Sequence, residues 1–158
     1  MAKIVFDTPS ELIDQFERIG KKIGEVEGSV AETLLYRSAE AMIREWKSAI
    51  EEENLIDTRD LYDSIGIDGP ASRKGGVYSV SVGAQGKDRK GVRNGLKASV
   101  LNYGSSSIAG RHFLPRIIST GNSEIRALQQ YLLDHYIATG DLPAIDWKTL
   151  KAKRKKKG

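Results

Sequence analysis

The sequence contains no cysteine and only two histidines among its 158 residues. Without cysteine the chain can form neither disulfides nor thiolate-ligated metal sites, and this composition is compatible with a reducing compartment. No stretch approaches the ~20 consecutive apolar residues that a membrane-spanning helix needs. The first residues also lack the pattern of a signal peptide. We therefore expect a soluble protein that acts inside the cell, or in an assembly made there, without binding a membrane.

The charges are unevenly distributed along the chain. Residues 1–63 hold 8 Lys and Arg and 15 Asp and Glu, a net charge of −7. Residues 64–158 hold 17 Lys and Arg and 6 Asp and Glu, a net charge of +11. Together they give the net charge of +4. One interpretation is a solvated surface followed by a basic tail. Another is that the acidic part of one copy meets the basic part of the next, a head-to-tail contact that can close into a ring.

Apolar residues recur at helical spacing in two segments near the N-terminus. The first segment begins at the capping sequence TPSE, residues 8–11, and continues until Gly20, Gly24 and Gly28 interrupt it. The second begins near Ser29 and keeps one apolar stripe to about residue 53. A helix of about 25 residues spans roughly 37 Å. We therefore expect it to form the spine of the fold or to extend into a partner.

Three short segments have the character of strands. Residues 4–6 form an apolar run. Residues 64–67 and 76–84 alternate between apolar side chains and mostly small or polar ones. The last two can pair as a hairpin, with residues 68–75 as its loop. Residues 85–95 hold four cations and three glycines, which is typical of a mobile, exposed loop.

The remaining segments predict one more helix. Residues 96–104 fit either a helix or an extended chain. A helix is expected to begin at or soon after Pro115, to start its main segment at residues 122–123, and to end at Gly140.

This order of elements predicts an α+β fold, with helices packed on one side of a small antiparallel β-sheet. The N-terminal helices include one long helix, the sheet follows them, and a C-terminal helix and a basic tail complete the chain. We place a single domain at residues 1–140 and a basic C-terminal extension at residues 141–158.

The passage NYGSSSIAGRHFLPRI combines serines, an arginine and a histidine, and so raises the question of a catalytic loop. A serine nucleophile needs a base that a third group holds in place, and the chain has no Gly-x-Ser-x-Gly elbow. Neither His112 nor His135 has a carboxylate at the spacing of a metal site. We therefore expect no catalytic residue, no metal and no cofactor, and a protein that is not an enzyme.

Two basic segments are candidates for contact with passing DNA or with a protein partner. Such runs bind phosphates through counterion release, without sequence specificity, although they can also simply keep a surface soluble. No signature of a dedicated nucleic-acid reader accompanies them. The candidate cations are Lys87, Arg89, Lys90 and Arg93 in the loop, and Lys153, Arg154, Lys155 and Lys156 in the tail.

Three further passages follow one another: DTRDLYDSI at 57–65, VLNYGSSS at 100–107 and HFLPRI at 112–117. In this order they resemble the small tail-completion or head–tail joining proteins of long-tailed bacteriophages, also called neck, minor tail or phage morphogenesis proteins. Those proteins show Thr-Gly-x-Leu-x-x-Ser-Ile, an aromatic-Gly-Thr/Ser step and Pro-Phe-Leu-x-Pro. The matching residues here are Thr58, Leu61, Ser64, Ile65, Tyr103, Gly104, Ser105, Phe113 and Leu114.

The match has three departures. Arg59 stands where glycine is usual, His112 replaces the first proline, and Pro115 comes one place early. The resemblance covers about residues 8–138. These departures affect the conformation of the loops more than the overall similarity.

The resemblance implies a structural protein of the virion without catalytic activity. Such a subunit forms a homo-oligomeric ring, here expected to be a hexamer, that completes the tail and joins it to the head. Its implied partners are further copies of itself, neck or adaptor proteins on the head side, and the tail terminator or tail tube on the other. It would assemble in the host cytoplasm and remain in the neck or tail of the virion.

Phe113, Leu114 and Pro115 are expected to anchor the loop of residues 104–112 to the core. The loop is then either a plain connection or, in the functional interpretation, faces a neighbouring subunit. The candidate interface residues are Tyr103, Gly104, Ser105, Arg111, His112 and Phe113. The basic segments alone favour a different interpretation, a nucleic-acid-binding accessory protein that acts non-specifically through its loop and tail.

Overall fold

The computed structural model describes residues 3–7, 27–55, 59–74, 77–142 and 145–152. They form an α+β fold, as the sequence predicts. The elements in chain order are β1 (Lys3–Asp7), α2 (Glu27–Glu52), α3 (Asp60–Asp63), β2 (Ile65–Ile67), β3 (Ser72–Lys74), β4 (Val77–Ala84), α4 (Asn94–Tyr103), α5 (Phe113–Thr139) and the 3-10 helix η1 (Trp147–Leu150). The helix predicted to start at residue 8 and the tail cations at 153–156 lie outside the described residues.

β4 is the central strand of the antiparallel sheet. β1 pairs along one edge, with Lys3 opposite Gly83 and Asp7 opposite Ser79. β2 pairs with the end of β4, as predicted for these two segments. Ser79 also lies opposite Ser72 of β3, so β3 runs along the edge away from β1. The predicted hairpin loop therefore contains a short strand of its own.

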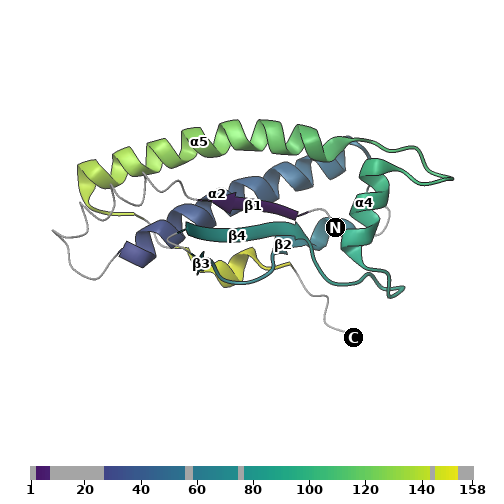
Figure 1. Ribbon diagram of the computed structural model, residues 1–158, viewed down its shortest axis with the longest axis horizontal. Coiled ribbons are helices and arrows are strands. Elements are labelled where there is room, and N and C mark those ends of the chain that lie inside the picture. The colour runs from purple at the N-terminus through teal and green to yellow at the C-terminus, as the bar shows by residue number, and fades with distance from the viewer. Residues whose placement is uncertain (1–2, 8–26, 56–58, 75–76, 143–144, 153–158) are drawn as a thin grey trace.

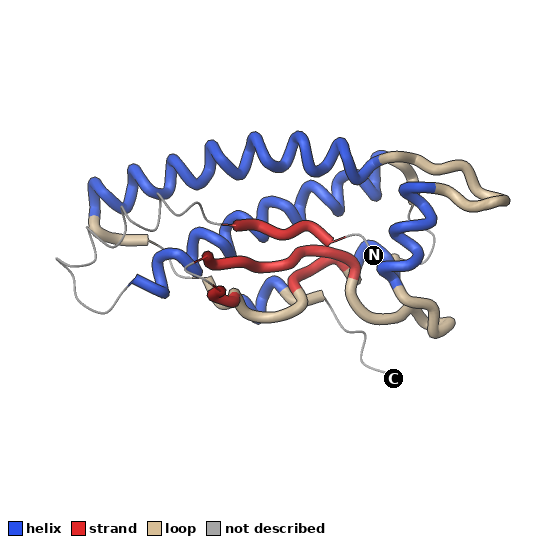
Figure 2. The backbone as a smooth tube through the Cα atoms, in the orientation of Figure 1, coloured by secondary structure: helices blue, strands red, loops and turns tan. Residues whose placement is uncertain are grey.

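The molecule has three layers, with α5 on α2 and α2 on the sheet (Figures 1 and 2). Alternation along β4 directs Tyr78, Val80 and Val82 into the core, while Ser79 and Ser81 on the opposite face remain half-buried. The apolar stripe of α2 is buried as the sequence predicts. Its members include Leu35, Ala39, Met42, Ile43, Trp46 and Ile50.

α5 begins at Phe113, two residues before the earliest predicted start, and it has no separate beginning at residues 122–123. Pro115 lies in the first turn, where its missing N–H breaks no helical bond. The helix continues through Gly121. Glycine fits this position because α5 packs closely on α2 there: a Cβ would lie 2.9 Å from the sulfur of Met42. Gly140 ends the helix in the left-handed conformation, with a φ of 68°.

The chain returns to the core after α5. Leu150 of η1 is buried, and Lys151 forms a parallel bridge with Ile67 of β2. Gly66 makes this approach possible, because a Cβ there would lie 2.7 Å from the carbonyl oxygen of Leu150. Part of the segment that we assign to the C-terminal extension thus packs on the sheet, while the domain boundary at residue 140 stays a prediction.

Candidate functional site

The passages that carry the family resemblance meet at one end of the molecule, around α4 (Figure 1). α3 comes from the first passage and packs against α4. The second passage supplies the end of α4 and the loop after it, and the third supplies the start of α5. Residues 96–104, which the sequence left open between helix and extended chain, are thus helical up to Tyr103.

Asn102 joins α4 to α5. Its side chain is completely buried, and its Oδ1 accepts a hydrogen bond of 2.8 Å from the backbone N–H of Leu114. Its backbone oxygen accepts a second bond, of 2.9 Å, from the N–H of His112. Asn102 therefore caps the first turn of α5 from another helix. Asn94, Ala98 and Asn102 are buried at intervals of four residues, a spacing that could have revealed this face of α4.

The loop of residues 104–112 is a closed turn whose two limbs touch. Gly104 has a φ of 86°, and a Cβ on it would lie 2.8 Å from the backbone nitrogen of Gly110. Ser105 donates its N–H to the oxygen of Ile108 at 2.8 Å, and the Ser105 hydroxyl accepts from the N–H of Ser107 at 3.3 Å. These contacts shape the turn and give the serines a local structural role.

The candidate interface residues do not all reach the surface. Tyr103 is 69% exposed, and Ser105, Arg111 and His112 are exposed with it. Phe113 is only 1% exposed. Its ring packs edge-on against Trp46, with 6.2 Å between centroids. The prediction that Phe113 anchors this region to the core is therefore confirmed, whereas the prediction that it faces a neighbour is wrong.

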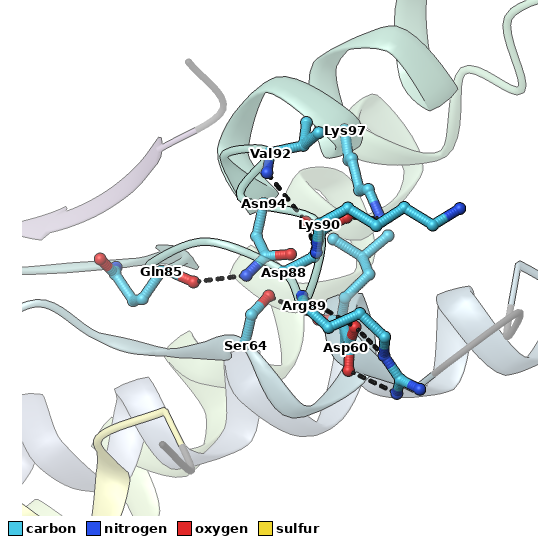
Figure 3. A network of polar contacts seen from close by, with 10 residues as sticks. Asp60, Ser64, Gln85, Asp88, Arg89, Lys90, Val92, Asn94 and Lys97 are labelled. Atoms are coloured by element: carbon cyan, nitrogen blue, oxygen red, sulfur yellow. Dashed lines mark hydrogen bonds and ion pairs between the residues drawn. The ribbon is translucent and has the colours of Figure 1, made fainter. Parts of the chain in front are cut away.

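The basic segment before α4 is held by two carboxylates (Figure 3). Asp60 of α3 accepts from Nε of Arg89 at 2.8 Å and from its Nη2 at 3.0 Å, a bidentate pair. Asp88 accepts from the N–H groups of Lys90 and Val92, both at 2.8 Å, and pairs with Lys97. Sequence reasoning missed both acids, and the predicted loop is a hydrogen-bonded turn followed by the start of α4.

The cations of this turn fall into two groups. Arg89 and Lys97 are neutralised by Asp60 and Asp88. Lys87, Lys90 and Arg93 are exposed, and none of the three forms an ion pair with any residue that the structure describes. The turn thus exposes these three cations on a backbone that the hydrogen bonds of Asp88 hold in place.

A pocket of about 480 Å³ lies between α3, α4 and the two loops that flank α4. Its apolar walls are Leu55, Leu61, Val92, Leu96, Val100, Leu101 and Ile108, and its polar ones are Asn54, Arg59 and Lys97. Leu96 is 57% exposed and Ile108 47%. Ile108 comes from the serine-containing loop, so this loop forms one wall of the pocket.

Acid should loosen the basic turn. The hydrogen bond from Lys97, followed by those from the N–H groups of Val92 and Lys90, holds the pKa of Asp88 below its ordinary value of 3.8. Because the folded pKa is lowered, this stabilisation is complete above pH 3.8 and is lost as the pH falls below it. We expect the hydrogen-exchange protection of the Lys90 and Val92 amides to fall in this range.

The matching substitution is Asp88→Asn, which should reduce the protection of the same two amides at neutral pH and make it insensitive to acid. Asp141→Asn, at an exposed acid beyond α5, is the control and should leave both amides unchanged. Full protection in Asp88→Asn at pH 7 would mean that the carboxylate does not hold the turn.

Within the described ranges, no three acidic or histidine side chains gather as a metal site would require. The helices among these residues are all too short or too polar to cross a membrane. Comparison of the chain with models of protein families, with curated proteins and with solved structures gave no match.

Proposed function

We propose that this chain is a structural subunit of the virion of a long-tailed bacteriophage. It forms a homo-oligomeric ring at the neck, completes the tail and joins it to the head. The observation that carries this proposal is the convergence of the three family-like passages on one exposed end of the molecule. Leu61 of the first passage and Val100 and Leu101 of the second line the surface pocket at this end.

The character of this end supports a contact with protein. Exposed apolar side chains line the pocket, and the turn before α4 holds exposed cations that form no ion pair with the described residues. An apolar centre with a polar rim is the usual arrangement of a protein–protein interface. The partners are further copies of the chain, neck or adaptor proteins of the head, and the tail terminator or tail tube.

Deletion of the gene from its parent phage tests the proposal. We expect electron microscopy of the lysate to show DNA-filled heads and complete-looking tails that remain separate. Supplying the wild-type chain from a plasmid should restore joined particles. Normal, infectious virions after the deletion would contradict the proposed role.

The same complementation can test the exposed loop. Arg111→Glu reverses a charge that the structure leaves exposed, so it should reduce the yield of joined particles while the melting temperature of the purified chain stays unchanged. Lys74→Glu reverses a charge that is also exposed, on β3 and away from α4, and should complement fully. An unchanged yield with Arg111→Glu would exclude this loop from the contact.

A non-specific nucleic-acid-binding accessory protein is the second candidate. The exposure of Lys87, Lys90 and Arg93 without ion pairs among the described residues favours it. Its affinity for duplex DNA would fall steeply with salt concentration, and removal of residues 153–158, which leaves the buried Leu150 in place, would abolish binding. A ring subunit should still assemble without those residues.

A further inference from the structure

We propose that the pocket beside α4 receives the second half of α5 from the next copy of the chain, so that subunits join head to tail. This inference rests on the proposed function, because it specifies how the ring is built. It names the two surfaces that meet and the side chain that enters the pocket.

The two surfaces lie at opposite ends of the molecule. Figure 1 shows α4 beside the start of α5, whereas the last turns of α5 extend to the far end, as Figure 2 also shows. One copy cannot fill its own pocket with these turns. A second copy can, and the resulting contact joins two different surfaces, so it can be repeated around a ring.

Tyr131 is the side chain that the second half of α5 presents. It is 66% exposed, and its ring stacks on that of His135, with 6.4 Å between centroids. Buried Leu133 and Tyr136 occupy the other side of the helix. A large exposed aromatic side chain, held by a neighbour on the next turn, has the form of an anchor residue at an interface.

The pocket matches such an anchor in size and character. Its volume is about 480 Å³, and aliphatic side chains supply most of its wall, among them Leu61, Leu96 and Ile108. An aromatic ring buries a large apolar area in such a site. Duplex DNA presents phosphates and offers no apolar side chain to fill it, so the pocket favours protein over nucleic acid.

The charges around the two surfaces are complementary. Residues 124–141 carry three acids, Glu124, Asp134 and Asp141, and one cation, Arg126. Asp134 lies one helical turn from Tyr131, and both Asp134 and Asp141 are exposed. The exposed cations at the pocket end include Lys87, Lys90, Arg93 and Arg111, and the exposed acids Glu51 and Glu52 lie just before the pocket residues Asn54 and Leu55. The exposed cations outnumber these acids, so Asp134 would meet a net positive surface when Tyr131 enters the pocket.

The absence of cysteine allows a direct test. We would introduce Leu96→Cys at the pocket and Ala127→Cys on α5, both at exposed positions, and oxidise the purified double variant mildly. Ala127 lies one helical turn before Tyr131, so the proposed anchor stays in place. A disulfide requires Cα atoms within about 7 Å, so it reports docking. Because each copy has both thiols, head-to-tail docking should give a ladder of covalent oligomers, whereas each single variant can give no more than a dimer.

The control pairs Leu96→Cys with Ser119→Cys, which is also exposed but lies in the first half of α5. We expect the test pair to cross-link about tenfold faster than the control pair or more, because docking raises the effective concentration of the thiols. Thermal melting of each variant would verify folding. The same oxidation is repeated on phage particles that contain the variants, where the assembled state is present.

Several results would overturn the inference. One is equal cross-linking of the test and control pairs, and another is the absence of a ladder both in solution and in particles. Efficient dimers of the Leu96→Cys single variant would indicate a symmetric contact instead. Protection of this thiol by duplex DNA, without cross-linking to position 127, would assign the pocket to DNA.

The outcomes also separate this contact from the proposed function. If deletion of the gene leaves heads and tails unjoined but no ladder forms, the neck role stands and the contact is wrong. If the ladder forms but the deleted phage is normal, the contact stands and the neck role is wrong.

Discussion

Phe113→Ala should lower the free energy of unfolding by about 3–5 kcal/mol. Phe113 is the first residue of α5, almost completely buried, and packs edge-on against Trp46. Its removal leaves a cavity between α2 and the start of α5 and withdraws the anchor of the loop before it. Since domains of this size are stable by only about 5–15 kcal/mol, we expect the variant to be partly unfolded at 37 °C.

Urea denaturation followed by circular dichroism measures this change. Tyr103→Ala is the matched control, because it removes an aromatic side chain from the same family-like region at a position that is mostly exposed. We expect it to change stability by no more than about 0.5 kcal/mol. A loss below about 1 kcal/mol in Phe113→Ala would show that the core does not depend on this contact.

Gly66→Ala should release the C-terminal segment from the sheet. A Cβ at residue 66 would lie 2.7 Å from the carbonyl oxygen of Leu150 and closer still to the backbone nitrogen of Ala152. Both obstacles are backbone atoms, so no change of side-chain rotamer can relieve the clash. The segment must move, and the burial of Leu150, about 1.5–3 kcal/mol for a side chain of this type, is lost with it.

Limited trypsin digestion with mass spectrometry detects the release, because Lys148 and Lys151 lie in the segment. Gly66→Ala should be cut there much earlier than the wild type. Gly69→Ala provides the control, since a Cβ at residue 69 meets nothing within 4 Å. Equal rates of cleavage in the two variants would mean that close packing at Gly66 does not fix the segment.

The regular elements of the core could be predicted from the sequence. The stripe of α2 and the alternation of β4 each place apolar residues at the period of their own backbone, so local spacing was enough. The helical end at Gly140 was also predictable, because glycine adopts the left-handed conformation easily. These features depend on residues close together in the chain.

The candidate site could be predicted only in part. Its location around Tyr103 and Arg111 came from the family resemblance. The hydrogen bonds that hold the site together, however, join residues far apart in sequence. Asp60 and Arg89 are separated by 29 positions, and no local pattern pairs them. The same applies to Asn102, whose partner Leu114 belongs to another helix. The helical start before Pro115 likewise follows from packing against α2.

The bridge between Ile67 and Lys151 has a consequence for aggregation. An uncovered edge strand offers unpaired backbone groups to any other chain, and edge-to-edge pairing is a common route to aggregates. Lys151 occupies the outer side of β2 at Ile67 and places a lysine beside that edge. The returning segment therefore blocks addition of a foreign strand to β2 at this point.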